Sequence, residues 1–404
     1  QIHKSLLIIT MLVIVSCPLT AASIQGVAEL NVRDIDGQFF VIMKEQADLT
    51  QSRGLTGKEL KGQFVYQALT ETALSSQRDI KTTLDQAGIR YKSYWIQNML
   101  LVFGDDALRA QLEARPDVAE TRPNRYYIAL DPDANGNASN AESARGIEWN
   151  LTQIRADQVW DELGVKGNDI IVCDNDTGVD WDHPALINQY RGYDGMTADH
   201  NYNWYDGTST SPDEPIDDHG HGTHTTGTIV GWDGADNQIG VAPSATWIGT
   251  KCMDADGGGQ DAWFHNCFQW ALAPTDLSGE NADPMMAPHV INNSWGYAGG
   301  NDPIFEADVA ALVAAGIFIE VSAGNEGPDC QTLRSPSDYE NAFTTGSTMQ
   351  GGNISGFSSR GPSQLYPTLA KPEIVAPGSN IRSSVPGGGY QGGWNGTSMA
   401  GPHA

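Results

Sequence analysis

From about Gly146 to the end of the chain, short apolar runs alternate with segments of helical periodicity. Strands that alternate with helices predict a parallel sheet with helices on both faces. The expected strands are 170–173, 246–252, 290–295, 317–322, 342–347 and 373–376, and the expected helices are 221–230, 261–272 and 304–315. In such a fold, polar residues that follow the strands gather at the carboxyl edge of the sheet. A site is therefore expected at that edge.

The residues before this stretch follow a different pattern, β-α-β-β-α-β over 38–130. This order predicts a small α+β module of the ferredoxin-like type. Strands are expected at 38–43 and 118–130, a hairpin or bent strand at 91–103, and helices at 57–86 and 105–114. The segment that follows, 131–145, is rich in Asp, Asn, Ala and Ser without an apolar period, which indicates an exposed linker.

Residues 1–22 combine a basic start, an apolar run from Leu6 to Val15, and small residues up to Ala22. This combination is typical of a secretory signal peptide, and the run is too short to span a bilayer. We therefore expect a secreted, extracellular protein with no stable membrane span. An alternative stays open, because Ile14-Val15-Ser16-Cys17 is similar to a bacterial lipobox, in which Cys17 would carry a lipid anchor.

The formal net charge of −27 limits the classes of partner. Nucleic acid is excluded as an expected partner, because phosphate contacts need Lys and Arg. The acidity is interpreted as a contribution to solubility.

The chain has five cysteines, and export would permit disulfides. Cys252 and Cys267 flank one glycine-rich loop and a short helix, so they are the expected pair. Cys173 lies in an apolar strand and is expected to be a small core residue.

The first polar motif is Asp-Thr-Gly at 176–178, where an expected strand meets a glycine turn. A carboxylate at this point can fix the tautomer of a histidine, although an Asp that only caps a turn is the simpler interpretation of the motif alone. Asp174 precedes it by two residues. Asp174 is either a second carboxylate on the same side of the strand or the polar end of a shorter strand.

The second motif holds three histidines, His219, His221 and His224. Their H-x-H-x-x-H spacing suggests a zinc hydrolase, since imidazoles and carboxylates are good zinc ligands. Position 223 is Thr where dinuclear zinc sites have Asp, and no later histidine stands at a convincing position. The alternative is that His221 is a general base at the start of a helix.

Two further motifs can supply an oxyanion donor and a nucleophile. Asn325 follows an expected strand in a glycine-flanked turn, where its amide can stabilise a developing oxyanion or merely complete the turn. In Gly-Thr-Ser at 396–398, Ser398 stands at the start of a helix. There its unpaired backbone N–H can stabilise an anion.

Together, and in the order Asp, His, Asn, Ser, the four motifs resemble those of the subtilisin family of serine peptidases. The segments 148–150, 181–186, 201–204 and 291–296 resemble its bacillopeptidase F-like branch. The resemblance covers about 146–404, and the module 38–130 resembles the inhibitory pro-domain of the family.

The resemblance implies a serine endopeptidase that acts on proteins or peptides. Ser398 would be the nucleophile, His221 the general base, Asp176 its orienting carboxylate, and Asn325 an oxyanion-hole donor. Two segments would clamp an extended peptide by β-augmentation and a third would line the pocket for the residue before the cleaved bond. These are, in turn, Gly257, Gly258 and Gly259; Ser294, Trp295 and Gly296; and Ser322, Ala323 and Gly324.

The resemblance also implies a zymogen. The signal peptide would be lost on export, and the pro-domain would act as an intramolecular inhibitor until the linker with the maturation site, 131–145, is cut. The family continues beyond the motif around Ser398, so part of the peptidase domain 146–404 is expected to lie C-terminal to this sequence.

No cofactor and no metal ion are expected for catalysis. The segment 231–238 is shorter than the best-known calcium loop of the family, so that site is not carried over. Asp-rich loops such as 254–256 leave a structural calcium ion open, without an assigned site.

Overall fold

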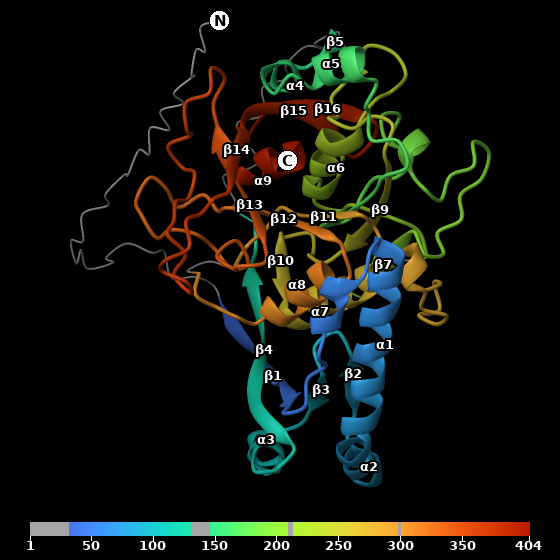
Figure 1. Ribbon diagram of the computed structural model, residues 1–404, viewed down its shortest axis with the longest axis vertical. Helices are drawn as coiled ribbons and strands as arrows, with labels where there is room; N and C mark the ends of the chain where they lie inside the picture. Colours follow the sequence, from blue (N-terminus) through green and yellow to red (C-terminus); the bar gives the residue numbers. More distant parts are fainter. Residues whose placement is uncertain (1–31, 131–145, 209–212, 298–299) are drawn as a thin grey trace, which may run out of the picture.

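A computed structural model describes residues 32–130, 146–208, 213–297 and 300–404. The segments predicted to be the signal peptide and the linker lie outside the described residues. The remainder forms two units, an N-terminal unit (32–130) and a C-terminal unit (146–404), which lie against each other along the long axis of the molecule (Figure 1).

The C-terminal unit is built on a seven-stranded sheet with the order β14-β13-β12-β11-β6-β9-β7. Every neighbouring pair in this sheet is parallel. The strands are β6 (Ile171–Asp176), β7 (Trp204–Asp206), β9 (Thr246–Lys251), β11 (Val290–Asn293), β12 (Phe318–Ser322), β13 (Phe343–Thr348) and β14 (Ile374–Pro377). The predicted α/β fold with a parallel sheet is confirmed.

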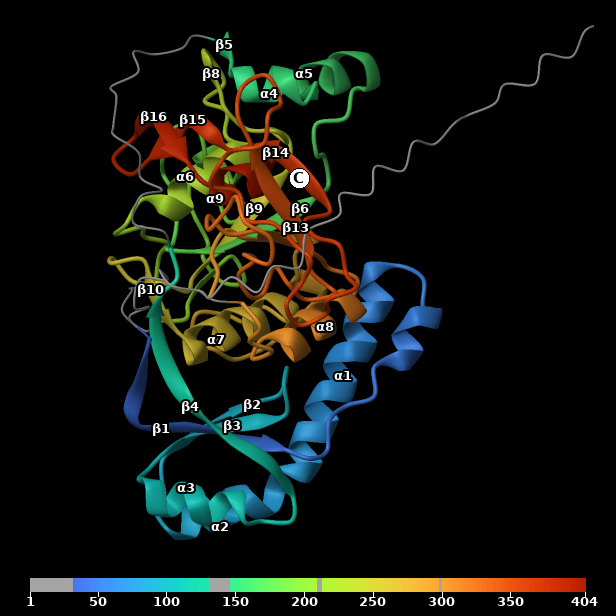
Figure 2. The same ribbon diagram turned by 90° about the vertical axis from the view of Figure 1, so that its left-hand side faces the viewer.

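Helices cover both faces of this sheet, α6 (His221–Val230) and α9 (Thr397–Ala400) on one face and α7 (Asp261–Leu272) and α8 (Glu306–Ala314) on the other (Figures 1 and 2). The helix α6 begins after Gly220, whose φ of 100° lies in the left-handed region that favours glycine. An antiparallel pair, β15 (Ser379–Val385) and β16 (Gly389–Asn395), leads directly into α9.

The N-terminal unit has four antiparallel strands in the order β4-β1-β3-β2. Its elements are β1 (Arg33–Met43), α1 (Lys58–Ser76), α2 (Arg78–Gln86), β2 (Tyr91–Tyr94), β3 (Met99–Phe103), α3 (Asp106–Glu113) and β4 (Val118–Ile128). The predicted α+β module is confirmed. The single helix expected over 57–86 is divided at Gln77, whose buried side-chain amide donates to the carbonyl of Tyr94 at 2.8 Å.

The two units share a sheet and apolar packing. The short strand β10 (Gly258–Gln260) pairs antiparallel with β4, which extends the N-terminal sheet to five strands. The face of that sheet that looks toward the C-terminal unit packs Phe40, Tyr94 and Leu101 against Ala262 of α7. The position of β4 relative to the C-terminal unit is thus fixed by main-chain pairing and by side-chain packing.

The disulfide predicted between Cys252 and Cys267 is wrong, because both cysteines are free and buried, as is Cys173. Each thiol has a hydrogen-bond partner of its own. The Cys252 Sγ lies 3.1 Å from Thr250 Oγ1, and the Cys267 Sγ lies 3.6 Å from the Lys251 carbonyl. The two residues therefore act as small core side chains.

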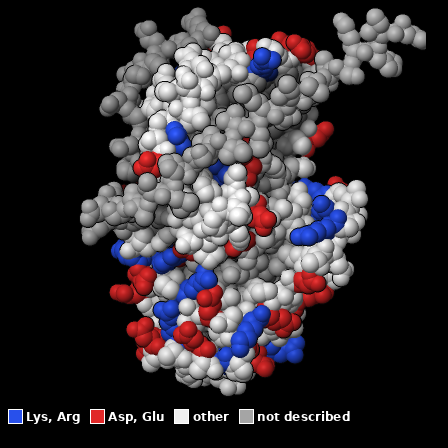
Figure 3. Space-filling view, turned by 60° about the vertical axis from the view of Figure 1, so that its left-hand side comes forward, with Lys and Arg blue, Asp and Glu red and all other residues white. Residues whose placement is uncertain are grey.

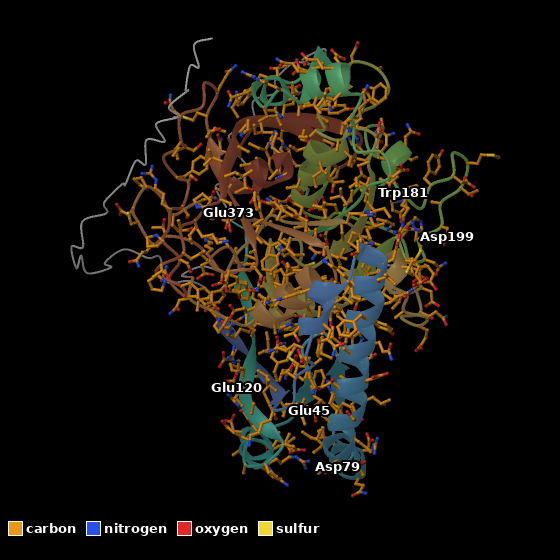
Figure 4. The ribbon with its side chains drawn as sticks, viewed as in Figure 1. Glu45, Asp79, Glu120, Trp181, Asp199 and Glu373 are labelled. Carbon is orange, nitrogen blue, oxygen red and sulfur yellow. The ribbon has the colours of Figure 1, made fainter. Side chains whose placement is uncertain are left out.

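The charges are distributed over both units. Figure 3 shows Lys and Arg interspersed with Asp and Glu on the visible face of the N-terminal unit. The acidic side chains labelled in Figure 4 are Glu45, Asp79 and Glu120 on the N-terminal unit and Asp199 and Glu373 on the C-terminal unit. Within the described ranges, no helix combines the length and apolar character that crossing a bilayer requires.

Candidate active site

Asp176 and His221 meet in the interior of the C-terminal unit. Asp176 is the last residue of β6, His221 is the first residue of α6, and both are fully buried. The Nδ1 atom of His221 lies 2.8 and 2.9 Å from the two carboxylate oxygens of Asp176. Burial opposes the charged imidazole, but the adjacent carboxylate outweighs it, so the pKa of His221 is raised above 6.5. The Nε2 atom is buried and has no hydrogen-bond partner among the described residues.

The start of α6 is held in place by Asp217. One carboxylate oxygen of Asp217 accepts from the Thr177 hydroxyl at 2.8 Å and from the Gly220 N–H at 2.8 Å. The other oxygen accepts from the N–H and the hydroxyl of Thr223. This side chain therefore joins the turn after Asp176 to the first turn of the helix that carries His221.

Asp174 lies inside β6 and is almost fully buried. It accepts hydrogen bonds from the hydroxyls of Thr225 and Thr226 on α6 and from the amide of Asn292 on β11. Burial, with the charge of Asp176 added, raises the pKa of Asp174 to about 7. The interpretation of Asp174 as the polar end of a shorter strand is wrong, since β6 continues to Asp176.

Ser398 lies in the first turn of α9 and lines a small cavity together with Asn325. Its hydroxyl donates to the carbonyl of Ser294 at 2.8 Å and not to His221. The side-chain oxygen of Asn325 accepts from the N–H of Thr397 at 2.9 Å and from its hydroxyl at 3.1 Å. This leaves the amide nitrogen as the half of the Asn325 side chain that can donate toward the cavity.

The two predicted peptide-binding segments lie on either side of the residues that follow β4. The N–H groups of Ala129 and Leu130 donate to the Gly257 carbonyl at 3.0 and 3.1 Å, and the Gly296 N–H donates to the Ala129 carbonyl at 3.2 Å. Gly258 is paired with Ile128 in the ladder of β10 and β4. The N-terminal unit therefore places the end of β4 and the residues that follow it between 257–259 and 294–296.

The predicted pocket-lining residues divide into two groups. Ser322 and Gly324 line the cavity beside Ser398, whereas the carbonyl of Ala323 accepts the backbone N–H of Arg334 at 3.3 Å. The indole of Trp295 donates to the Asn175 carbonyl at 3.0 Å, and its ring packs on Phe264 in the core.

Sequence motifs did not identify Arg334, which also lines this cavity. Arg334 does not belong to a recognisable sequence motif, so its position beside Ser398 becomes clear only from its contacts in the folded protein. A second missed residue, Glu320, is a buried carboxyl group close to Gly401, the residue after α9, and its burial raises its pKa well above the usual value. An acidic residue within an otherwise apolar strand segment was the signal that could have drawn attention to it.

The three histidines considered as zinc ligands have different surroundings. His221 is bound by Asp176, and His224 stacks on Trp394 with a ring-centroid distance of 4.2 Å. Within the described part of the chain, no three or more His, Cys, Asp and Glu side chains are grouped so that they could hold a metal ion. The Asp254 carboxylate, considered for calcium, accepts from Asp256 N, Gly258 N and the Tyr126 hydroxyl.

Comparison with known proteins identifies the family of the chain. The model of the subtilase family matches residues 167–404, which is more than half of the chain. The chain therefore belongs to the subtilase family, and within it to the bacillopeptidase F-like branch.

It is 41% identical to Bacillopeptidase F of Bacillus subtilis over 85% of this chain and 25% of that protein. It is 30% identical to Subtilisin E of Bacillus subtilis over 83% of this chain and 75% of that protein. The chain thus spans about a quarter of the length of the first relative and three quarters of the second.

Proposed function

We propose that the chain is the precursor of a secreted serine endopeptidase that hydrolyses peptide bonds through an acyl-enzyme intermediate. The observation that carries the proposal is the buried pair of His221 and Asp176, with His221 Nδ1 bound and Nε2 without a partner. An imidazole held in this way can accept a proton at Nε2, which is the task of the general base in this reaction.

In the proposed reaction, the hydroxyl of Ser398 turns from the Ser294 carbonyl toward His221 and attacks the carbonyl carbon of the substrate. Its proton passes to His221 Nε2 and then to the departing amine as the C–N bond breaks. Water attacks the ester and gives a proton to His221, which returns it to Ser398. The amide of Asn325 and the backbone N–H of Ser398 stabilise the oxyanion.

The N-terminal unit is proposed to be an intramolecular inhibitor. The support is the segment Ala129–Leu130 that follows β4, because it uses the Gly257 carbonyl and the Gly296 N–H. A substrate bound by β-augmentation needs the same main-chain groups. While the N-terminal unit is in place, protein substrates are excluded. Removal after a cut in 131–145 opens the site, and residues 1–22 direct export.

The test is covalent labelling of the protein with a fluorophosphonate after maturation has removed the N-terminal unit. The wild type is expected to be labelled at one serine, Ser398→Ala is expected to take up no label, and Ser278→Ala, in an exposed loop, is expected to label like the wild type. An unlabelled wild type, or equal labelling of Ser398→Ala, would contradict the proposal. Activity that a chelator abolishes, in a protein that takes up no label, would favour the zinc hydrolase instead.

A further inference from the structure

Arg334 occupies the pocket beside Ser398. It lines the same cavity as Ser398 and Asn325, and its backbone N–H donates to the Ala323 carbonyl. A Cβ atom added to Gly296 would lie 2.8 Å from Arg334 Cβ, and one added to Gly324 would lie 3.0 Å from Arg334 Cγ. Any larger residue at position 296 or 324 would therefore crowd the side chain of Arg334.

The pocket holds little open space beside Arg334, and Ala129 of the N-terminal unit lines it as well. The cavity that remains is about 10 Å³, at the limit for holding one water molecule. A side chain that enters the pocket after the N-terminal unit leaves would therefore contact the side chain of Arg334. Selection at this position depends on what compensates the positive charge.

The guanidinium of Arg334 has one carboxylate partner and spare donors. It forms an ion pair with Glu326, while its Nε is buried without a hydrogen-bond partner among the described residues. Glu326 is held in place independently, because its Oε2 accepts from Asn325 N at 2.9 Å and from the Ser359 hydroxyl at 3.2 Å. A buried N–H without an acceptor is costly, and a ligand carboxylate would satisfy it.

An arginine that binds two carboxylates at once is already present elsewhere in this chain. Arg125 binds Asp261 through Nε at 2.8 Å and Asp302 through Nη1 at 2.6 Å. A carboxylate that enters beside Arg334 would form the same arrangement with Glu326 as the other acid. An aromatic side chain would separate Arg334 from Glu326 without replacing the lost acceptor, and a lysine would add a like charge.

We propose that Arg334 is the specificity-determining residue of this peptidase and that the pocket selects an acidic side chain, Glu or Asp, in the residue before the cleaved bond. This inference rests on the proposed function. Glu326 competes for the same guanidinium and therefore weakens the selection.

The test uses the full-length protein after maturation and a set of peptides that differ only in the residue before the cleaved bond: Glu, Asp, Gln, Phe or Lys. The active-site concentration is titrated with a fluorophosphonate, so that kcat/KM refers to functional enzyme only. In the wild type, kcat/KM for Glu is expected to exceed that for Gln and Phe by about 10- to 100-fold, the worth of a hydrogen bond to a charged group. Arg334→Gln is expected to bring the Glu-to-Gln ratio close to one, and Arg334→Lys to retain part of it.

Two variants serve as controls. Glu326→Gln keeps an acceptor for Asn325 but removes the competing charge, so the Glu-to-Gln ratio is expected to rise. Arg360→Gln removes a positive charge from a residue that does not line the pocket, and the ratio is expected to stay as in the wild type. A labelled wild type that cleaves after Phe faster than after Glu, or an unchanged ratio in Arg334→Gln, overturns the inference alone. A wild type that takes up no label overturns the proposed function and the inference together.

Discussion

Arg125, on the last strand of the N-terminal unit, forms an ion pair with Asp261 at the first turn of α7, with Nε 2.8 Å from the carboxylate. The same guanidinium reaches Asp302 and lies over the ring of Tyr297. Asp261 is fully buried in this arrangement. If the N-terminal unit leaves, Asp261 loses this partner, so we expect the contact to help hold the two units together.

Arg125→Ala is expected to loosen the N-terminal unit. Because removal of one partner of a buried charge pair costs about 3–5 kcal/mol, we expect fluorophosphonate labelling of the uncleaved precursor to become at least about 10-fold faster. Arg122→Ala removes a partly exposed arginine paired with the more exposed Glu120, and it should label like the wild type. Equal rates for the two variants would contradict the role of Arg125.

The pH dependence of activity is expected to follow His221. The imidazole acts as a base only when neutral, so kcat/KM should rise with pH through its pKa. Since Asp176 raises that pKa, the midpoint of the acid limb should lie above 6.5 in the wild type. Asp176→Asn should move the midpoint down and lower kcat by several orders of magnitude. An acid limb that stays in place in this variant would argue against the pairing.

Asn325→Ala is expected to lower kcat by about 10²–10³-fold, the usual effect of losing one oxyanion-hole donor. KM should change little, because the donor acts on the charge that develops in the transition state. Steady-state kinetics on a peptide substrate separate the two constants. A rise in KM with an unchanged kcat would show that Asn325 binds the substrate in its ground state instead.

Asp174→Asn is expected to change how stability depends on pH. The pKa of Asp174 is raised from 3.8 to about 7 in the folded protein. Between these values the folded state holds a proton that the unfolded state has lost, so this group lowers the free energy of unfolding as pH rises through that window. The Tm of the variant should therefore fall less than that of the unsubstituted protein as the pH rises through this window. Thermal unfolding in a Ser398→Ala background, which avoids self-digestion, would show parallel curves if the prediction is wrong.

Alternation of strands and helices was sufficient to predict the parallel sheet, because apolar strand and helix patterns depend only on local sequence. The end of β6 was predicted at Cys173, because Asp174 is polar, whereas the strand continues to Asp176. It continues because hydroxyls on α6 satisfy that carboxylate. Glu320 lies buried in β12 without a hydrogen-bond partner for its carboxyl oxygens among the described residues, and burial favours its neutral form. The surroundings that distant segments supply decide such cases, and they cannot be found in a local pattern.

Some residues of the candidate site could be predicted from local sequence, and others could not. Asp176, His221, Asn325 and Ser398 stand in motifs that fix both residue type and turn, so the sequence was enough to propose their roles. Arg334 has no such surroundings, and its place in the pocket depends on close approach to Gly296 and Gly324. For Cys252 and Cys267, the sequence suggested a contact that the structure lacks. Nearness along the chain does not give the side-chain orientation that a disulfide needs.

The strand β10 pairs with β4 through main-chain hydrogen bonds, and every polypeptide carries the groups that form them. Under the proposed function, the first requirement on a protein substrate is therefore a free stretch of backbone, whatever its side chains. A folded protein offers such a stretch only when it opens locally. The rate at which this peptidase degrades a given protein should then follow how often that protein unfolds in part, with the pocket choosing only where the opened segment is cut.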